Sequence, residues 1–162
     1  MAYDDIPEKL VFHECKIVYR NLAGRIDEYN ERGDRSFAVV IDDPELADQL
    51  EEDGWRIKRR PPRIEGNPDF VTLKVFVKYE NRPPKIYLVC GGVRTLLSES
   101  TVGEIDAAEI LNVKLACVPY RGKNSRDGKF SAYCKTMYVY AEGDEFEDDF
   151  VDEYNDEVPF DE

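Results

Sequence analysis

Lysine and aromatic side chains share one face of the clearest strand-like segment, residues 69–79. Alternation places Lys74, Phe76 and Lys78 on that face. The opposite face is apolar and consists of Val71, Leu73, Val75 and Val77. Lysine offers positive charge to phosphates, and an aromatic ring offers a flat surface on which an unpaired base can stack for about 1–3 kcal/mol. The segment therefore predicts a surface for single-stranded nucleic acid. The alternation fits equally well a solvated strand face whose Phe76 is covered by a helix.

Other basic and aromatic residues could extend this surface. Tyr133 lies beside Lys135 in a second strand-like run, and a basic loop at 121–129 could grip a phosphate backbone, as barrel loops often do. Five bases within residues 56–63 are typical either of a solvated stretch or of a loop that follows phosphates. The full set of predicted DNA-contacting residues is Arg20, Arg25, Tyr29, Arg35, Phe37, Arg59, Arg60, Arg63, Lys74, Phe76, Lys78, Arg121, Lys123, Arg126, Lys129, Tyr133 and Lys135.

Residues arranged for catalysis or for metal binding are scarce. The sequence has no G-x-x-x-x-G-K-[ST], G-x-S-x-G or H-E-x-x-H motif, and His13 is its one histidine. The four cysteines lie far apart within apolar runs, which favours small core residues over disulfides or a zinc site. A two-metal nuclease built on Asp42 and Asp43 is the enzymatic alternative, although Asp43 has a simpler role as a helix cap before Pro44. We therefore expect no enzymatic activity, no cofactor and no metal site.

The elements that must position these side chains are mostly strands. Sequence patterns predict strands at 11–20, 35–42, 55–60, 69–79, 85–90, 93–97, 111–119 and 130–140. Two short helices are expected, one between the cap Asp43 and Gly54, and one opened by a capping box from Thr101 to Glu104. Trp55 is expected in the core. Because signals for parallel crossovers are few, the pattern predicts a mainly antiparallel sheet or a small barrel.

The charge of the chain is divided between a body and a tail. The net charge is −13, but residues 141–162 hold 12 acids and no bases, which leaves −1 for the other residues. Within the body, residues 56–140 carry 16 bases and 8 acids, a net of +8. We therefore predict a binding domain over 1–140 and a disordered acidic tail over 141–162. No signal peptide and no membrane span are recognised, so we expect the protein in the cytoplasm, without a membrane partner.

The tail carries aromatic residues, which a purely solubilising segment does not need. Its end, Val158-Pro159-Phe160, is similar to the Ile-Pro-Phe that closes the acidic tail of bacterial single-stranded DNA-binding proteins. Here two further acids follow Phe160, so the ring does not carry the terminal carboxylate. The residues predicted to bind replication or recombination proteins are Phe150, Tyr154, Val158, Pro159 and Phe160.

A set of short stretches, in order along residues 11–140, resembles the single-stranded DNA-binding proteins of tailed bacteriophages, especially those of actinobacteria. The stretches are 19–24 (YRNLAG), 37–44 (FAVVIDDP), 53–55 (DGW), 82–86 (RPPKI), 108–113 (AEILNV), 119–120 (PY) and 132–139 (AYCKTMYV). The resemblance implies an OB-like β-barrel that coats replication or recombination intermediates. It does not identify the residues that contact DNA.

The sequence as a whole predicts a mainly β, OB-like antiparallel barrel with two short helices and an acidic tail, which binds single-stranded DNA without sequence preference. The sequence leaves open whether the protein forms a homodimer. The alternative is an acidic decoy that mimics DNA and binds a host protein, for which the acids should be spread over the folded surface.

Overall fold

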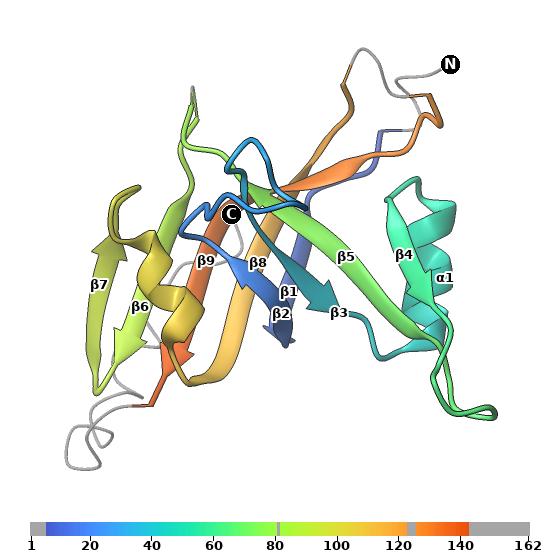
Figure 1. The fold of residues 1–162 in the computed structure, drawn as a ribbon, viewed down its shortest axis with the longest axis horizontal. Coiled ribbons are helices and arrows are strands. Elements are labelled where there is room, and N and C mark those ends of the chain that lie inside the picture. Colours follow the sequence, from blue (N-terminus) through green and yellow to red (C-terminus); the bar gives the residue numbers. More distant parts are fainter. Residues whose placement is uncertain (1–5, 81, 123–125, 143–162) are drawn as a thin grey trace.

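The computed structural model describes residues 6–80, 82–122 and 126–142 (Figure 1). These residues are mostly in strands, with one α-helix and one short 3-10 helix. The elements are β1 (Leu10–Cys15), β2 (Ile17–Asn21), β3 (Arg35–Val40), α1 (Pro44–Glu52), β4 (Ile57–Arg60), β5 (Phe70–Val77), β6 (Lys85–Cys90), β7 (Val93–Leu97), η2 (Val102–Ala107), β8 (Ile110–Tyr120) and β9 (Ser131–Ala141). No helix among them is long and apolar enough to cross a membrane.

One sheet runs in the order β1-β8-β9-β5-β3-β2. Hydrogen bonds do not close this path, but its two ends, β1 and β2, are halves of one bent strand with Lys16 between them. The carbonyl of Lys16 accepts a hydrogen bond from the amide of Val40 at 2.9 Å. A first strand shared by both ends of the path gives the partly open barrel of the OB type. The predicted OB-like β fold with two short helices is confirmed.

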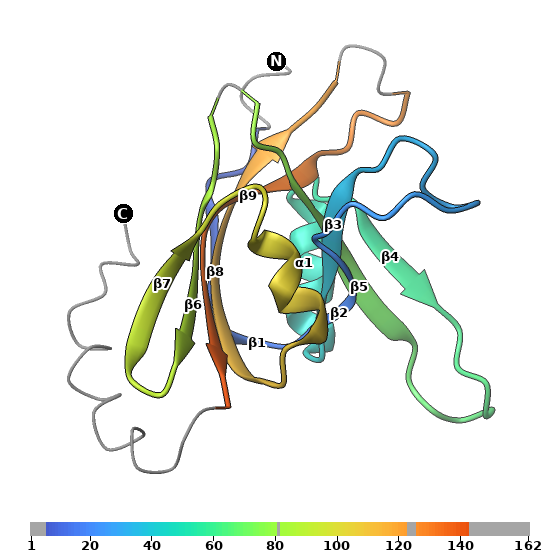
Figure 2. The ribbon, with the colours of Figure 1, turned by 60° about the vertical axis from the view of Figure 1, so that its left-hand side comes forward.

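The strand pairing is mainly antiparallel, as predicted, but it includes two parallel pairs that the sequence did not indicate. β9 pairs in parallel with β5 and with β6, whereas its pairing with β8 is antiparallel. The parallel pairs arise because long connections separate β9 from both partners along the chain. β4 pairs with β5 beside α1, and the β6–β7 hairpin extends the sheet at β9, as Figures 1 and 2 show. The outward side chains of β4 and β6 therefore lie beside those of β5 and β9.

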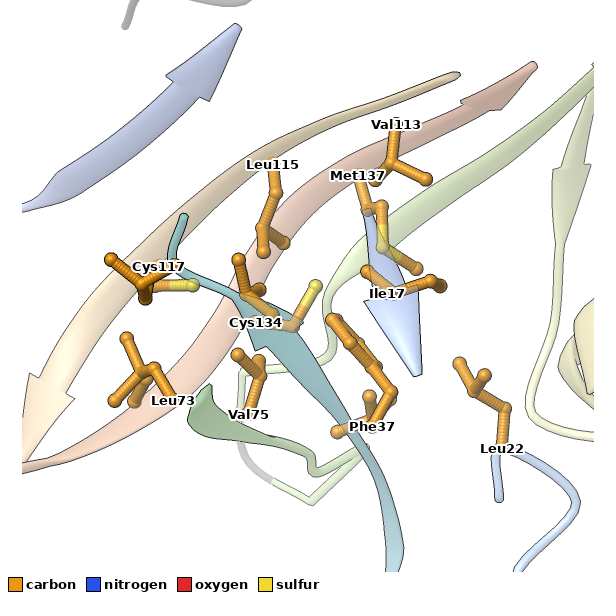
Figure 3. Close-up of a cluster of buried hydrophobic side chains, with 14 of the residues drawn as sticks. Ile17, Leu22, Phe37, Leu73, Val75, Val113, Leu115, Cys117, Cys134 and Met137 are labelled. Atoms are coloured by element: carbon orange, nitrogen blue, oxygen red, sulfur yellow. The ribbon is translucent and has the colours of Figure 1, made fainter. Parts of the chain in front are cut away.

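The barrel interior is apolar and follows the predicted alternation. Val71, Leu73, Val75 and Val77 of β5 are all buried, and so is Trp55. Figure 3 shows part of this core, where Cys117 and Cys134 lie among Leu73, Leu115 and Met137. All four cysteines are free thiols, and burial raises the pKa of the Cys117 and Cys134 thiols well above their ordinary value. These two cysteines therefore act as small core residues.

The two helices differ in how they begin. At α1 the carboxylate of Asp43 accepts a hydrogen bond from the amide of Glu45 at 3.0 Å, and Pro44 takes the first position, as predicted. The capping box expected at Thr101 is absent, since its hydroxyl makes no bond to the helix and instead accepts one from the amide of Ser98 at 2.8 Å. The hydroxyl thus holds the turn before η2, which is a 3-10 helix.

The last strand, β9, ends at Ala141, one residue past Tyr140. Ala141 is still paired with Ile110 and Cys90, and the amide of Glu142 donates to the carbonyl of Glu109 at 3.0 Å. The predicted partner-binding residues Phe150, Tyr154, Val158, Pro159 and Phe160 lie outside the described residues.

Candidate nucleic-acid interface

Three aromatic rings lie side by side on the outer face of neighbouring strands. Phe76 of β5 is in register with Tyr133 of β9, and their ring centroids are 6.1 Å apart at an angle of 62°. Tyr120 of β8 stacks on Tyr133 at 4.5 Å with nearly parallel planes. The three side chains point outward because the alternate residues of each strand fill the core. We call Phe76, Tyr120 and Tyr133 the central aromatic group.

Lysines flank this group. The ammonium of Lys74 lies 4.9 Å from the centre of the Phe76 ring, and that of Lys78 lies 5.7 Å from it. Lys78 also pairs with Asp34 at 3.2 Å, whereas Lys74 makes no ion pair with any residue that the structure describes. Burial raises the pKa of the Tyr133 hydroxyl, and nearby Tyr120, Asp34 and Glu80 add to the shift. The ring is therefore neutral at physiological pH and does not repel phosphate.

A second aromatic pair lies at the β2–β4–β5 end of the same face. Tyr19 and Phe70 meet edge to face at 6.4 Å, and the guanidinium of Arg60 lies 5.8 Å from the Tyr19 ring centre. Tyr19 is 59% exposed and has a positive φ of 53°, which is rare for a residue other than glycine. Such backbone strain is concentrated at functional sites. Together with exposed aromatic rings, it marks Tyr19 and Phe70 as candidate stacking residues.

Two hollows receive most of the predicted residues. The larger, of about 680 Å³, is lined by Tyr19 and Phe70. Its predicted residues are Arg20, Arg25, Tyr29, Phe37, Arg60 and Lys74. Tyr29 is 91% exposed on the loop between β2 and β3. The smaller, of about 240 Å³, is lined by the central aromatic group with the predicted residues Lys78, Arg121 and Lys129. Lys135, another strand residue of the set, is exposed on β9 and lines neither hollow.

Two predicted contacts, Phe37 and Arg35, are corrected by the structure. Phe37 is 1% exposed and belongs to the core, because β3 turns it inward, in register with Val75. Arg35 faces the same side as Phe37 and pairs with Glu99 at 3.1 Å, away from Lys74. Both residues are therefore removed from the candidate interface.

Arg59 and Arg20 are engaged in holding elements together. Arg59 pairs with Asp48 and Glu51 of α1 at 2.8 and 3.0 Å. Its neighbours in β4, Lys58 and Arg60, line the larger hollow instead. The guanidinium of Arg20 donates to the carbonyls of Ile105 and Ala108 at 2.7 and 2.9 Å, which attaches η2 to the end of β2. Both arginines thus hold elements together, while Arg20 also lines the larger hollow and stays a predicted contact.

Two further predicted residues, Arg63 and Arg126, line neither hollow. Arg63 and Arg126 are exposed on loops, and Lys123 lies outside the described residues. Conversely, Tyr19, Lys58, Phe70 and Tyr120 lie in the hollows without having been predicted. Phe70 alternates with Thr72 and Lys74 on the predicted face of β5, so extending that alternation by two positions would have found it.

Comparison with known proteins identifies the family of the chain. Residues 2–160 match a family model described as "Putative phage ssDNA-binding domain". The chain belongs to this family of phage single-stranded DNA-binding domains. No protein with a curated description matches the sequence.

Solved structures of one phage protein share the fold of this family member. The single-stranded DNA-binding protein from bacteriophage Enc34 is similar with a TM-score of 0.52 and 12% identity, over 82% of this chain and 80% of that chain. The same protein in complex with ssDNA gives a TM-score of 0.53 and 13% identity, over 83% of this chain and 86% of that chain. The likeness extends over most of both chains and supports the OB-type assignment.

Proposed function

We propose that the chain binds single-stranded DNA without sequence preference across the outer face of β5, β9 and β8, and coats the strand during phage replication or recombination. The observation that carries this proposal is the central aromatic group, flanked by Lys74 and Lys78. Stacking accepts any base because every base has a flat face, and lysines neutralise phosphates regardless of sequence. The arrangement is that of a binding surface and not of a catalytic centre.

The positions of the two hollows suggest the path of a DNA strand across this surface. In OB folds, oligonucleotides lie across the second and third strands between the loop after the first strand and the loop between the last two. Here those loops are residues 22–34, with Tyr29, and 121–130, with Arg121 and Lys129. We propose that a strand runs between them, from Tyr19 and Phe70 at one end to Phe76 and Tyr133 at the other.

Replacing Phe76 or Tyr133 by alanine tests the proposal. Loss of one stacking ring should weaken the binding of a short labelled oligonucleotide by about 5- to 150-fold, the equivalent of about 1–3 kcal/mol. Fluorescence anisotropy measures the affinity, and circular dichroism checks that each variant remains folded. Folded variants with the affinity of the parent protein would remove the central aromatic group from the interface. Absence of DNA binding by the parent itself would favour the acidic decoy.

We propose two roles for the acidic segment 143–162. Its charge competes with DNA for the basic surface, and its aromatic residues Phe150, Tyr154, Val158, Pro159 and Phe160 bind a replication or recombination protein once DNA displaces the segment. The competition rests on charge, because the segment holds 11 acids and no bases. Tethering gives it a high effective concentration beside the surface.

A further inference from the structure

A third hollow, a groove of about 910 Å³, begins where the proposed DNA surface ends. Tyr133 and Lys78, which flank the smaller hollow, also line this groove. From there the groove follows the outer face of β9 along its pairing with β6 and reaches Tyr87 and Tyr138. A strand lying over Tyr133 is therefore already at the mouth of the groove.

The groove is basic. Exposed Arg82, Lys85 and Lys135 line it, and none of the three makes an ion pair with any residue of the described ranges. Glu80 is the one acid among its lining residues. Such an excess of unpaired positive charge suits a phosphate backbone.

A β-bulge exposes Lys135 at this point. The register of β8 and β9 passes from Cys117–Cys134 to Ala116–Thr136, so Lys135 has no partner in β8. A bulge inserts an unpaired residue and re-aims its side chain. Lys85 lies next to it, because β6 pairs Lys85 with Thr136. The fold thus brings two exposed lysines together from strands that are far apart in sequence.

The far end of the groove holds a fixed aromatic ring. Tyr87 and Tyr138 are in register and stack at 4.9 Å with an angle of 13° between their planes. Tyr138 is only 3% exposed, and it holds the half-buried Tyr87 ring from the neighbouring strand. The guanidinium of Arg94 lies 5.5 Å from the centre of the Tyr87 ring. These contacts fix the orientation of the Tyr87 ring, so a base that packs against it in the groove costs the ring little further freedom.

We infer that bound single-stranded DNA continues beyond Tyr133 into this groove, with Lys85 and Lys135 contacting its phosphates and Tyr87 a base. The inference rests on the proposed function and extends it to a second segment of the same strand. Continuity with Tyr133 favours DNA, because a strand stacked on this ring reaches the groove without a break. Short oligonucleotides should then occupy the OB face alone, whereas long ones should also fill the groove.

The test compares an oligonucleotide of about 6 nucleotides with one of about 16, within the range that one OB fold covers. The full-length double variant K85A/K135A should bind the short one like the parent protein. For the long oligonucleotide, we plot the logarithm of the binding constant against the logarithm of the salt concentration. The slope for the double variant should be less steep than that for the parent by about 1.4, or 0.7 for each phosphate that a lysine no longer neutralises. Y87L, which retains packing against Tyr138, should weaken the long one only. The single variant K135A should reduce the slope by about 0.7. K16A, which removes one exposed lysine outside the groove, is its matched control.

Three outcomes would overturn the inference. Equal weakening for both lengths would mean that the lysines attract DNA generally, and an unchanged salt slope for the long oligonucleotide would leave the groove without DNA. If K85A/K135A binds long DNA normally but no longer binds a synthetic peptide of residues 143–162, the groove is an acidic-peptide site. Failure of the proposed function would give a different result from failure of this inference. In that case F76A would bind the short oligonucleotide as tightly as the parent protein.

Discussion

Phe37 and Phe76 lie on paired strands and have opposite surroundings. Phe37 of β3 is in register with Val75, and the next pair joins Ser36 to Phe76. Successive pairs in a sheet face opposite sides, so Phe37 fills the barrel while Phe76 meets Tyr133 outside it. The side of the sheet, and not the residue type, decides whether each ring stabilises the fold or is available to DNA.

We therefore predict that F37A and F76A have opposite effects. F37A should lower the free energy of unfolding by about 3–5 kcal/mol, because it removes a fully buried ring and leaves a cavity. F76A should cost much less stability and mainly reduce affinity for DNA. Urea denaturation of both variants measures the difference. A small loss of stability in F37A would contradict the core position of its ring.

For single residues, the sequence correctly predicted which face of a strand is buried, but it did not predict the contacts of every side chain. The alternation of β5 correctly placed four valine and leucine side chains inside. It could not show that Arg59 would pair with Asp48 and Glu51, since this requires α1 to pack beside β4. Nor could it find Tyr19, whose positive φ arises at the end of β2 where the pairing with β3 shifts register.

Among the elements, η2 determines the position of the loop that carries Arg25 and Tyr29. The carboxylate of Asp106 accepts hydrogen bonds from the amides of Leu22 and Ala23 at 2.8 and 3.1 Å, and it pairs with Arg25 at 3.3 Å. Gly103 allows the close approach, since a Cβ there would lie 2.9 Å from that of Ala23. The short helix is thus a support for one wall of the larger hollow.

We predict that D106A loosens this loop. The substitution would leave two amides without their partner, one of them in the fully buried Leu22, at a cost of about 1–3 kcal/mol. Hydrogen exchange of residues 22–34 should accelerate, and DNA affinity should fall modestly because Arg25 and Tyr29 are no longer held. E104A changes an exposed acid of the same helix and is the control. Equal exchange in both variants would show that Asp106 does not position the loop.

For the molecule as a whole, the order of strands was less predictable than their existence. The hairpin at Gly91-Gly92 and the start of α1 are determined by neighbouring residues, and both are present as predicted. The parallel pairs of β9 join residues that are about fifty apart or more, as in Phe76 and Tyr133, and no local pattern specifies such a partner. For the same reason, Tyr87 was not recognised as a neighbour of Tyr138.

The distribution of charge leads to a prediction about the whole chain. Deleting residues 143–162 removes 11 acids and changes the net charge from −13 to −2, while β9 and the bond from the Glu142 amide to Glu109 are retained. If the segment competes for the basic surface, deletion should tighten DNA binding at low salt. The gain should shrink as salt rises, because exposed charges more than about 10 Å apart are largely screened at 0.1 M.

Two variants separate charge from aromatic contact in this competition. A chain of full length with the 11 acids changed to asparagine or glutamine should bind DNA like the deletion. A chain with Phe150, Tyr154 and Phe160 changed to serine retains every acid, so it should bind DNA like the parent and lose only the binding of a partner protein. Titrations at two salt concentrations measure both effects. If the neutralised chain binds DNA no more tightly than the parent, charge does not drive the competition, and the 11 acids serve a purpose other than occupying the DNA surface.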